Sequence, residues 1–318
     1  MERKIKIGTR GSKLALWQAS WVQSALYKKD PLLSVEIEII KTKGDKILDV
    51  PLAMVGGKGL FVKEIEEALL DGRIDLAVHS MKDMPAEIPD GLCIGAIPQR
   101  EISQDVLISR NGHSFSELAN GAGIGTSSLR RGAQLLHARP DIAILPLRGN
   151  LDTRLKKLES GNMDAIILAA AGVKRLGFDH KITEYLNENI MLPAVGQGAL
   201  CIETREKDSV IKPLIATLDH QQTRKVVLGE RAFLCRLEGG CQIPIAASGR
   251  IEKNIFTITG LVATVNGATI IRNTMSGPEE DSEMVGTKLA ESLLSMGAKE
   301  ILEDLKNNFN YSATDSHR

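Results

Sequence analysis

Short apolar runs alternate with amphipathic stretches from the N-terminus to about residue 218. This alternation is typical of a mostly parallel β-sheet covered by helices, because buried strands are short and apolar whereas covering helices keep one polar face. The runs that predict strands are 5–7, 35–40, 74–78, 92–97, 106–109, 142–145, 164–168 and 199–203. The patterns that predict helices are 14–26, 62–70, 129–137 and 151–158.

The pattern changes after Asp219. A long helical stretch at 222–237 precedes a group of alternating, strand-like segments, and a further helical pattern follows them. The strand-like segments are 245–251, 255–265 and 269–273, and the later helical pattern is 282–294. Strands that follow one another directly predict a separate α+β domain of about 95 residues. Residues 307–318 have the composition of a frayed tail.

Two short patterns recur within the first 218 residues. The segments 7–12 and 124–128 each end a strand with Gly-Thr and open a helix. The segments 71–75 and 160–164 each place a glycine and then an aspartate between a helix and a buried strand. Their spacings differ, which excludes a tandem repeat of fixed period. The recurrence predicts two lobes of similar design, although such turns also recur by chance in α/β proteins.

Composition limits the class of protein. The chain has 318 residues, of which 43% are hydrophobic and 25% are charged, so it can build more than one core and is not disordered. Basic and acidic residues number 40 each, which excludes the general positive field that nucleic-acid binding needs. No apolar run is long enough for a secretory signal or a membrane span. With four cysteines and no Cys-x-x-Cys pair, we expect a cytoplasmic protein without a metal site.

Hydroxyl and guanidinium groups gather where a helix is predicted to begin, in the segment 125–131, Gly-Thr-Ser-Ser-Leu-Arg-Arg. Free backbone N–H groups and the helix dipole attract anions at such a position. Arg130 and Arg131 are cations that oppose this dipole, so they need a partner. A salt bridge to another lobe or a bound polyanion would supply one, and we favour the polyanion.

The segment 147–150 repeats this arrangement, because a strand ends there, Asn150 caps the next helix, and Arg154 lies one turn further on. Strand ends of a parallel sheet meet at one edge, which predicts one crevice for four arginines. These are Arg130, Arg131, Arg148 and Arg154, with Arg10 at the matching turn of the first lobe. Guanidinium groups bind carboxylates in a bidentate manner, and phosphate fits the residues equally well. The common glycine-rich nucleotide loops are absent from the sequence.

Candidate catalytic residues follow the strand predicted at 74–78, where His79, Lys82 and Asp83 lie close together. Polar groups at the carboxyl end of a strand often lie over a ligand site, and an aspartate there can stabilise a cation or move protons. Solvated loop charges would give the same residues, so both interpretations stay open. Residues 42–59 contain four glycines and little periodicity, as in a lid or a disordered segment.

Cys241 follows two glycines, which leave its thiol accessible, so it is the best candidate for a nucleophile or an attachment point. The other three cysteines lie in apolar strands or in a helical pattern, where a thiol usually acts as a small buried hydrophobic group. They are Cys93, Cys201 and Cys235.

Six segments, in order along nearly the whole chain, resemble the porphobilinogen deaminase family, also called hydroxymethylbilane synthases. They are 55–61 (Val-Gly-Gly-Lys-Gly-Leu-Phe), 79–83 (His-Ser-Met-Lys-Asp), 125–131, 147–150 (Leu-Arg-Gly-Asn), 192–198 (Leu-Pro-Ala-Val-Gly-Gln-Gly) and 237–242 (Leu-Glu-Gly-Gly-Cys-Gln). The resemblance implies an α/β fold of two doubly wound lobes like those of a type II periplasmic binding protein, plus a smaller C-terminal α+β domain. The implied divisions are 1–98 with 199–218 for lobe 1, 99–198 for lobe 2, and 219–318 for the domain with the cofactor attachment loop.

The resemblance also implies the activity. Such transferases join four porphobilinogen molecules head to tail, release ammonia, and give hydroxymethylbilane for tetrapyrrole, porphyrin and heme biosynthesis. The chain grows on a dipyrromethane cofactor, which the resemblance attaches to Cys241 through a thioether. Asp83 matches the catalytic carboxylate that pairs with pyrrole N–H groups and stabilises the cationic azafulvene left by loss of the amine. A cytoplasmic monomer is implied, with the small molecule porphobilinogen as substrate and with neither nucleic acid nor membrane as partner.

The remaining site residues are implied by position. Every pyrrole ring carries an acetate and a propionate, so basic and hydroxyl groups are expected around the growing chain. Cofactor binding is implied for Ser80, Lys82, Thr126, Ser128, Arg130, Arg131, Arg148, Arg154 and Gln197. Substrate binding is implied for Arg10, Ser12, Lys58, Phe61 and Arg175.

The sequence departs from the family pattern at three places. Met54 replaces the usual lysine of the lid, Ser103-Gln104 replaces Pro-Arg, and Thr204 replaces a frequent cysteine. None of these changes affects Asp83 or Cys241. The rival hypothesis is a non-catalytic, two-lobed anion-binding protein, which would use the same arginines but would give Cys241 no role.

Overall fold

The fold is taken from a computed structural model, which describes residues 4–46, 59, 61–238 and 243–314. The chain divides into two compact units. The first contains the described residues up to 46, between 59 and 101, and from 198 to 224, and the second contains 102–197 and the described residues from 225 onward. Each unit has a five-stranded sheet, and the second unit also has a three-stranded sheet.

The sheet of the first unit has the strand order β2-β1-β3-β10-β4. Its strands are β1 (Lys4–Thr9), β2 (Ser34–Ile39), β3 (Leu76–Ser80), β4 (Leu92–Ala96) and β10 (Leu200–Arg205). β1 pairs in parallel with β2 and β3, whereas β10 is antiparallel to both β3 and β4. Four strands therefore run in one direction and β10 runs against them, so the expectation of a mostly parallel sheet is confirmed.

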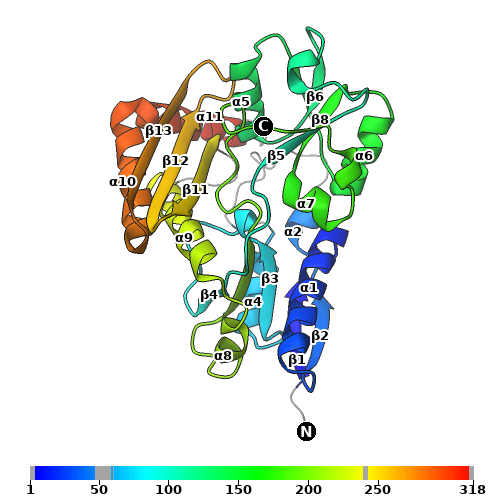
Figure 1. Cartoon of the computed structure of the whole chain (residues 1–318), viewed down its shortest axis with the longest axis vertical. Coiled ribbons are helices and arrows are strands. Elements are labelled where there is room, and N and C mark those ends of the chain that lie inside the picture. The colour runs from blue at the N-terminus through cyan, green and yellow to red at the C-terminus, as the bar shows by residue number, and fades with distance from the viewer. Residues whose placement is uncertain (1–3, 47–58, 60, 239–242, 315–318) are drawn as a thin grey trace. The chain divides into compact units, whose positions relative to one another are not determined.

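Helices cover both faces of this sheet (Figure 1). They are α1 (Lys13–Lys29), α2 (Lys43–Lys46), α4 (Lys63–Leu70) and α8 (Ile211–Ala216). Because side chains alternate along a strand, β3 contributes Leu76 and Val78 to the core under α1 and α8, and Ala77 to the core under α4. α4 therefore covers the opposite face from α1.

The five-stranded sheet of the second unit repeats this topology in the order β7-β6-β8-β5-β9. Its strands are β5 (Asp105–Ser109), β6 (Gly123–Gly125), β7 (Ala143–Leu145), β8 (Ala165–Ala169) and β9 (Glu184–Tyr185). β6 is parallel to β7 and β8, and β5 is antiparallel to β8 and β9. The reversed strand is again fourth in the order. The helices of this part are α5 (Leu129–Ala138), α6 (Leu151–Glu159) and α7 (Ala170–Arg175).

The recurring sequence patterns occupy equivalent positions in the two sheets. Asp75 Oδ2 accepts a hydrogen bond from Lys6 N of β1 at 2.9 Å, and Asp164 Oδ2 accepts one from Gly123 N of β6 at 2.8 Å. β1 and β6 are each second in their sheet. The prediction of two lobes of similar design is therefore confirmed.

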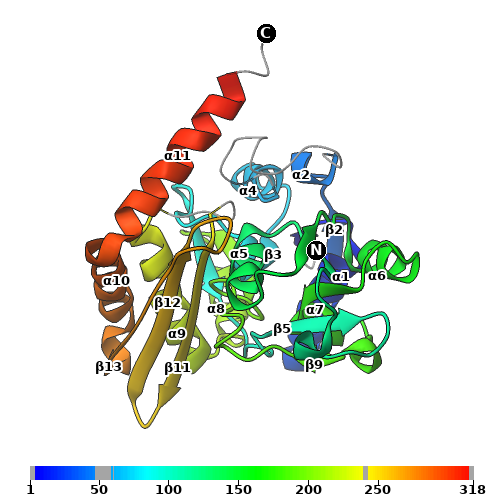
Figure 2. The same cartoon turned by 90° about the horizontal axis from the view of Figure 1, so that it is seen from above.

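The C-terminal part is a three-stranded antiparallel sheet with helices, and with the two lobes it confirms the predicted fold class (Figure 1). Its elements are α9 (Gln221–Arg236), β11 (Ile245–Glu252), β12 (Ile255–Ala263), β13 (Ile270–Pro278), α10 (Ser282–Leu293) and α11 (Lys299–Thr314). Figure 2 shows α11 as one long helix that leaves the sheet. The prediction of a frayed tail from residue 307 is wrong as far as Thr314, because the helix continues to that residue.

The hairpin between β12 and β13 contacts α5 within the second unit. Gly267, at the turn, places its carbonyl oxygen 2.9 Å from His137 Nδ1 of α5. A small apolar cluster lies under this contact and joins Ala133 of α5 to Leu261 of β12. The second unit thus includes both the second sheet and the C-terminal sheet, and the three-domain division stays a prediction.

Cys235 is exposed, so the prediction that its thiol is buried is wrong. Phe233 and Leu237 of the same segment face the core. Cys235 lies two residues from each of them, so on a helix its side chain points away from the core. Within the described ranges, every helix is too short or too polar to span a bilayer.

Candidate active site

Asp83 lines a small cavity of about 70 Å³ in the first unit. Five residues predicted for the site line this cavity together, and His79 and Gln18 line it too. The five predicted residues are Arg10, Ser12, Phe61, Ser80 and Asp83. The structure therefore brings the turn after β1 and the turn after β3 to one place, as the convergence of parallel strand ends requires.

Asp83 is held at the carboxyl end of β3 by backbone contacts. The strand ends at Ser80, and Met81–Asp83 form one turn of 3₁₀-helix. Met81 N donates a hydrogen bond to Ala199 O at 3.0 Å, and Met84 N closes the turn onto Met81 O at 3.1 Å. Asp83 is half-buried there, so its carboxylate has access to the cavity.

Gln18 of α1 orients the end of β3 from the other side of the cavity. Its side chain is only 2% exposed, and Nε2 donates a hydrogen bond to Ser80 Oγ at 2.8 Å. Ser12 caps α1, because its Oγ accepts a hydrogen bond from Ala15 N at 3.2 Å. Gln18 was not among the predicted residues. The available signal was a polar side chain between apolar positions on the buried face of an amphipathic helix.

Arg10 and Phe61 form a cation–π pair over the cavity. The Arg10 guanidinium carbon lies 4.3 Å from the centroid of the Phe61 ring. Such stacking fixes the plane of the guanidinium group, which a bidentate contact with a carboxylate needs. Lys58 and Cys241, both predicted for the site, lie outside the described residues.

The second unit brings a hydroxyl-rich turn and the turn that carries Arg148 together at the start of α5. Ser128 caps the helix and accepts a hydrogen bond from Arg131 N, and Thr126 Oγ1 accepts one from Ser128 N at 3.1 Å. Leu147 N donates to Ser127 Oγ at 3.0 Å, which joins the turn before Arg148 to the start of α5. The predicted convergence of these two strand ends is therefore observed.

Arg130 and Arg131 are buried around the carboxylate of Asp105. Arg130 Nη1 donates to Asp105 Oδ2 at 2.8 Å and to Leu192 O at 2.7 Å. Arg131 donates from Nε and Nη2 to Asp105 Oδ1, and from Nη1 to Ile167 O at 3.0 Å. Gln197 Nε2 donates to the same Oδ1 at 3.0 Å. The two arginines therefore pair with a carboxylate of their own unit and not with another lobe, and the bound polyanion stays a prediction.

Burial and charge oppose one another at this cluster. Burial lowers the pKa of the Arg130 guanidinium, whereas the charge of Asp105 raises it. Two guanidinium groups share one carboxylate, and a second anion would find a positive environment there. Asp105 was missed by the sequence analysis. Its signal was an acidic residue at the start of an otherwise apolar strand.

The other predicted cations of the second unit are half-buried. Arg154 Nε donates to Gly149 O at 2.8 Å, which keeps its stem beside the turn that carries Arg148. Arg175 lies at the end of α7, which begins directly after β8. Lys82, in the first unit, is half-buried in the turn that contains Asp83.

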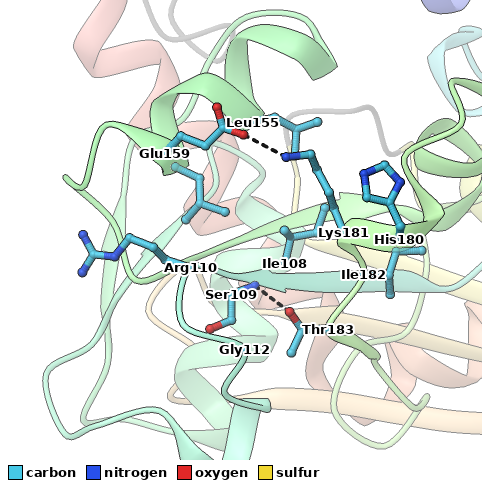
Figure 3. Close-up of a pocket in the computed structure, with 11 residues that line it drawn as sticks. Ile108, Ser109, Arg110, Gly112, Leu155, Glu159, His180, Lys181, Ile182 and Thr183 are labelled. Atoms are coloured by element: carbon cyan, nitrogen blue, oxygen red, sulfur yellow. Dashed lines mark hydrogen bonds and ion pairs between the residues drawn. The ribbon is translucent and has the colours of Figure 1, made fainter.

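A larger cavity of about 480 Å³ lies in the second unit, away from the predicted residues. Figure 3 shows Lys181 directed at Glu159, with 2.8 Å between Nζ and Oε1, and Thr183 accepting a hydrogen bond from Ser109 N at 2.9 Å. Because its charged groups pair with each other or with the backbone, this cavity is a weaker candidate than the cavity at Asp83. Across the parts that the structure describes, no group of three His, Cys, Asp or Glu side chains is arranged to hold a metal ion.

The fold and these turns define a class: a protein with two α/β sheets of the same topology, whose strand ends carry hydroxyl and guanidinium groups. Comparison with known proteins gives the particular family. The family models for the porphobilinogen deaminase dipyrromethane cofactor binding domain and the porphobilinogen deaminase C-terminal domain match residues 5–213 and 225–295. The chain belongs to the porphobilinogen deaminase family. It is a transferase of tetrapyrrole biosynthesis that polymerises porphobilinogen, and its cofactor is dipyrromethane.

Individual porphobilinogen deaminases show the same similarity. The chain is 56% identical to a porphobilinogen deaminase of Syntrophotalea carbinolica over 95% of this chain and 96% of that protein. It is 55% identical to one of Geobacter metallireducens over 95% of each chain. Among solved structures, the methionine binding protein MetQ aligns with a TM-score of 0.44 and 15% identity, over 68% of this chain and 89% of that one.

Proposed function

We propose that Asp83 is the carboxylate that stabilises the positive charge left on porphobilinogen when its amino group departs. The observation that carries this proposal is the cavity of about 70 Å³ that Asp83 shares with Arg10 and Ser12. A fixed negative charge beside a developing cation lowers the free energy of the transition state without reorganisation. Arg10, stacked on Phe61, and Ser12 receive the carboxylates of the incoming substrate, and Arg175 and Lys58 assist them.

The reaction also moves a proton from carbon to the leaving ammonia, and a residue must carry it. In each condensation the C–N bond to the amino group breaks and a C–C bond forms to the free α-carbon of the preceding pyrrole. The protonated amino group leaves as ammonia, the attacked carbon loses its proton once the C–C bond has formed, and ammonia takes up that proton, so charge is conserved. Asp83, as the carboxylate of the cavity, accepts the proton from the carbon and passes it to the ammonia.

The donor set fits a carboxylate-rich cofactor. Guanidinium groups and hydroxyls lie at the start of α5 and at the adjoining turn, and Arg130 and Arg131 share one carboxylate. The residues that hold dipyrromethane are Ser80, Lys82, Thr126, Ser128, Arg130, Arg131, Arg148, Arg154 and Gln197, with a thioether to Cys241. When bound, dipyrromethane supplies the anchored pyrrole end on which the product is built.

The cellular setting is part of the same proposal. The chain acts as a cytoplasmic monomer of three domains, without a nucleic-acid partner. Equal numbers of basic and acidic residues, 40 each, support the last point, because they leave no general positive field.

Asp83→Asn tests the catalytic role. We expect kcat to fall by about 10²-fold or more, because the amide carries no charge, while the cofactor stays bound. Asp90→Asn, an exposed aspartate of the same segment, is the matched control and keeps its kcat. If Asp83→Asn had the same kcat as the unaltered enzyme, Asp83 would have no role in the mechanism.

Cys241→Ser tests the attachment. The denatured variant should have the mass of the bare polypeptide, and an aldehyde reagent for pyrroles should give no colour. Pyrrole that persists after denaturation would exclude this thiol as the anchor.

A further inference from the structure

Two buried carboxyl groups lie beneath the strand that leads to Asp83. Glu203 of β10 is fully buried, and Glu66 of α4 is 7% exposed. Each has an Oε1 atom that is buried and has no hydrogen-bond partner within the described part of the chain. Buried polar atoms without a partner are rare in folded proteins, so two in adjoining elements need an explanation.

His79 distinguishes the two carboxyl groups. Its Nε2 lies 3.0 Å from Glu203 Oε2, and both side chains are almost fully buried. Because an ionised carboxylate only accepts hydrogen bonds, His79 is the donor. Glu203 is thus the carboxylate that already has a donor, whereas Glu66 Oε1 has none among the described residues.

We propose that Glu66 is held protonated, donates its O–H to Glu203 Oε1, and thereby positions Asp83 through Glu203 and His79. One proton between the two carboxyl groups satisfies both orphaned oxygen atoms at once. Glu66 does not reach the substrate, so it is a positioning residue. The inference rests on the role proposed above for Asp83.

The charges around Glu66 agree with a retained proton. Burial raises the pKa of Glu66 to about 7, the charges of Glu203 and Glu67 also raise it, and His79 lowers it. The other titratable or charged side chains on the strands packed against α4 are Cys93 of β4, Lys4 and Lys6 of β1, and Cys201 and Arg205 of β10. Lys4 and Lys6 pair with glutamates of β2, and Arg205 pairs with Asp75 and Asp208. Among the charges that act on Glu66, His79 alone favours ionisation.

The link to Asp83 is short. His79 directly precedes Ser80 and the turn that ends at Asp83, and it pairs with Cys201 in the β3–β10 ladder. Ionised Glu66 would place a second negative charge beside Glu203 and push α4 away from β10. The end of β3 then loses its fixed position, and kcat falls.

Glu66→Gln in the holoenzyme tests the proposal, because its amide donates a hydrogen bond at every pH. In the unaltered enzyme we expect kcat to fall more than about five-fold as the pH rises through the pKa of Glu66. The kcat of Glu66→Gln should stay at its low-pH value across that pH range. Glu67→Gln, an exposed change on the same helix, should keep the alkaline fall of kcat, moved to somewhat lower pH because the charge of Glu67 helps to raise the pKa of Glu66. The unaltered enzyme and the two variants act on the same substrate, so any effect of substrate titration on kcat is common to all three.

An infrared measurement separates this proposal from the role of Asp83. The carbonyl band of a protonated carboxyl group should be present below neutral pH and absent in Glu66→Gln, whatever the activity. The same alkaline fall of kcat in Glu66→Gln and the unaltered enzyme, or a carbonyl band that survives the substitution, would overturn the proposal. Retained activity in Asp83→Asn would instead refute the catalytic assignment and leave the infrared result intact.

Discussion

Asp105 Oδ1 accepts two hydrogen bonds from one side chain, from Arg131 Nε at 3.0 Å and from Arg131 Nη2 at 2.7 Å. The other carboxylate oxygen accepts from Arg130 Nη1 at 2.8 Å. One fully buried carboxylate therefore fixes both arginines of the first turn of α5. This contact orders the start of the helix, where Thr126 and Ser128 present their hydroxyls.

Asp105→Asn should destabilise the protein by about 3–5 kcal/mol, because it leaves two buried guanidinium groups without their counter-charge. The free energy of unfolding in urea measures the effect, and pyrrole content measures cofactor retention, which should also fall. Asp71→Asn breaks an exposed pair with Arg73 and is the control with little expected change. Equal unfolding curves for the two variants would contradict this account.

Gly267→Ala should destabilise the contact between the β12–β13 hairpin and α5. A Cβ atom at Gly267 would lie 2.3 Å from Ala133 O and 2.8 Å from His137 N, both backbone atoms of α5. Gly121→Ala is a close control, because Gly121 has a similar positive φ, +77° against +69°, and open space around it. Both variants bear the strain of the left-handed conformation, so the difference in unfolding free energy, about 1–3 kcal/mol, isolates the contact. Equal losses would show that the hairpin adapts.

Gln18→Leu removes the donor to Ser80 and should lower kcat several-fold. The free energy of unfolding should fall by about 1 kcal/mol, the usual net value of such a hydrogen bond. Gln23 of the same helix donates to Val35 O at the same distance of 2.8 Å, away from the cavity. Gln23→Leu should lower stability by a similar amount and leave kcat unchanged. A drop in kcat of equal size in both variants would mean that α1, and not the contact with Ser80, controls the rate.

Phe61→Leu removes the ring on which Arg10 stacks. We expect KM for porphobilinogen to rise about two- to five-fold with kcat nearly constant, since a cation–π pair that keeps access to solvent contributes about 0.5–1 kcal/mol. Steady-state kinetics with Phe178→Leu, in the other unit, supplies the comparison. A change confined to kcat would argue that Phe61 acts in the chemical step.

Stability should fall as the pH rises through the range in which Glu66 titrates. The folded-state pKa is raised from 4.5 to about 7, so the native protein binds more protons than the unfolded chain between these values. The protonated Glu66 contributes its full stabilisation below the unfolded-state pKa of 4.5. This contribution, up to about 3 kcal/mol, is lost as the pH rises through the folded-state pKa of about 7. Urea midpoints on either side of this range should differ for the unaltered protein and much less for Glu66→Gln. A pH dependence that is unchanged in the variant would contradict this.

The pattern of hydrophobic and polar residues predicted helices and strands well where buried positions recur at a regular spacing. The alternating run at 35–40 is β2, and the amphipathic stretch at 129–137 is α5, because both periods follow directly from which side of the element faces a core. The prediction of a frayed tail from residue 307 was wrong, because a polar composition does not distinguish an exposed helix from a frayed end.

The site was partly predictable. Arg10, Ser12, Ser80 and Asp83 follow strands, and parallel strand ends meet at one edge. The partners of Arg130 and Arg131 were not predictable, because Asp105 is 25 and 26 residues away in sequence and its burial depends on how β5 enters the second sheet. Glu66 and Glu203 were missed for the same reason, since a single acidic residue in a helix or strand does not reveal that another faces it.

The position of β10 between β3 and β4 has a consequence for biosynthesis. The ribosome makes β4 and the whole second five-stranded sheet before it reaches Leu200. Until then the nascent chain has no strand to join β3 to β4, and both carry an open edge of the kind that binds chaperones or pairs wrongly with other chains. The first lobe is therefore completed late in translation, although most of it is synthesised first.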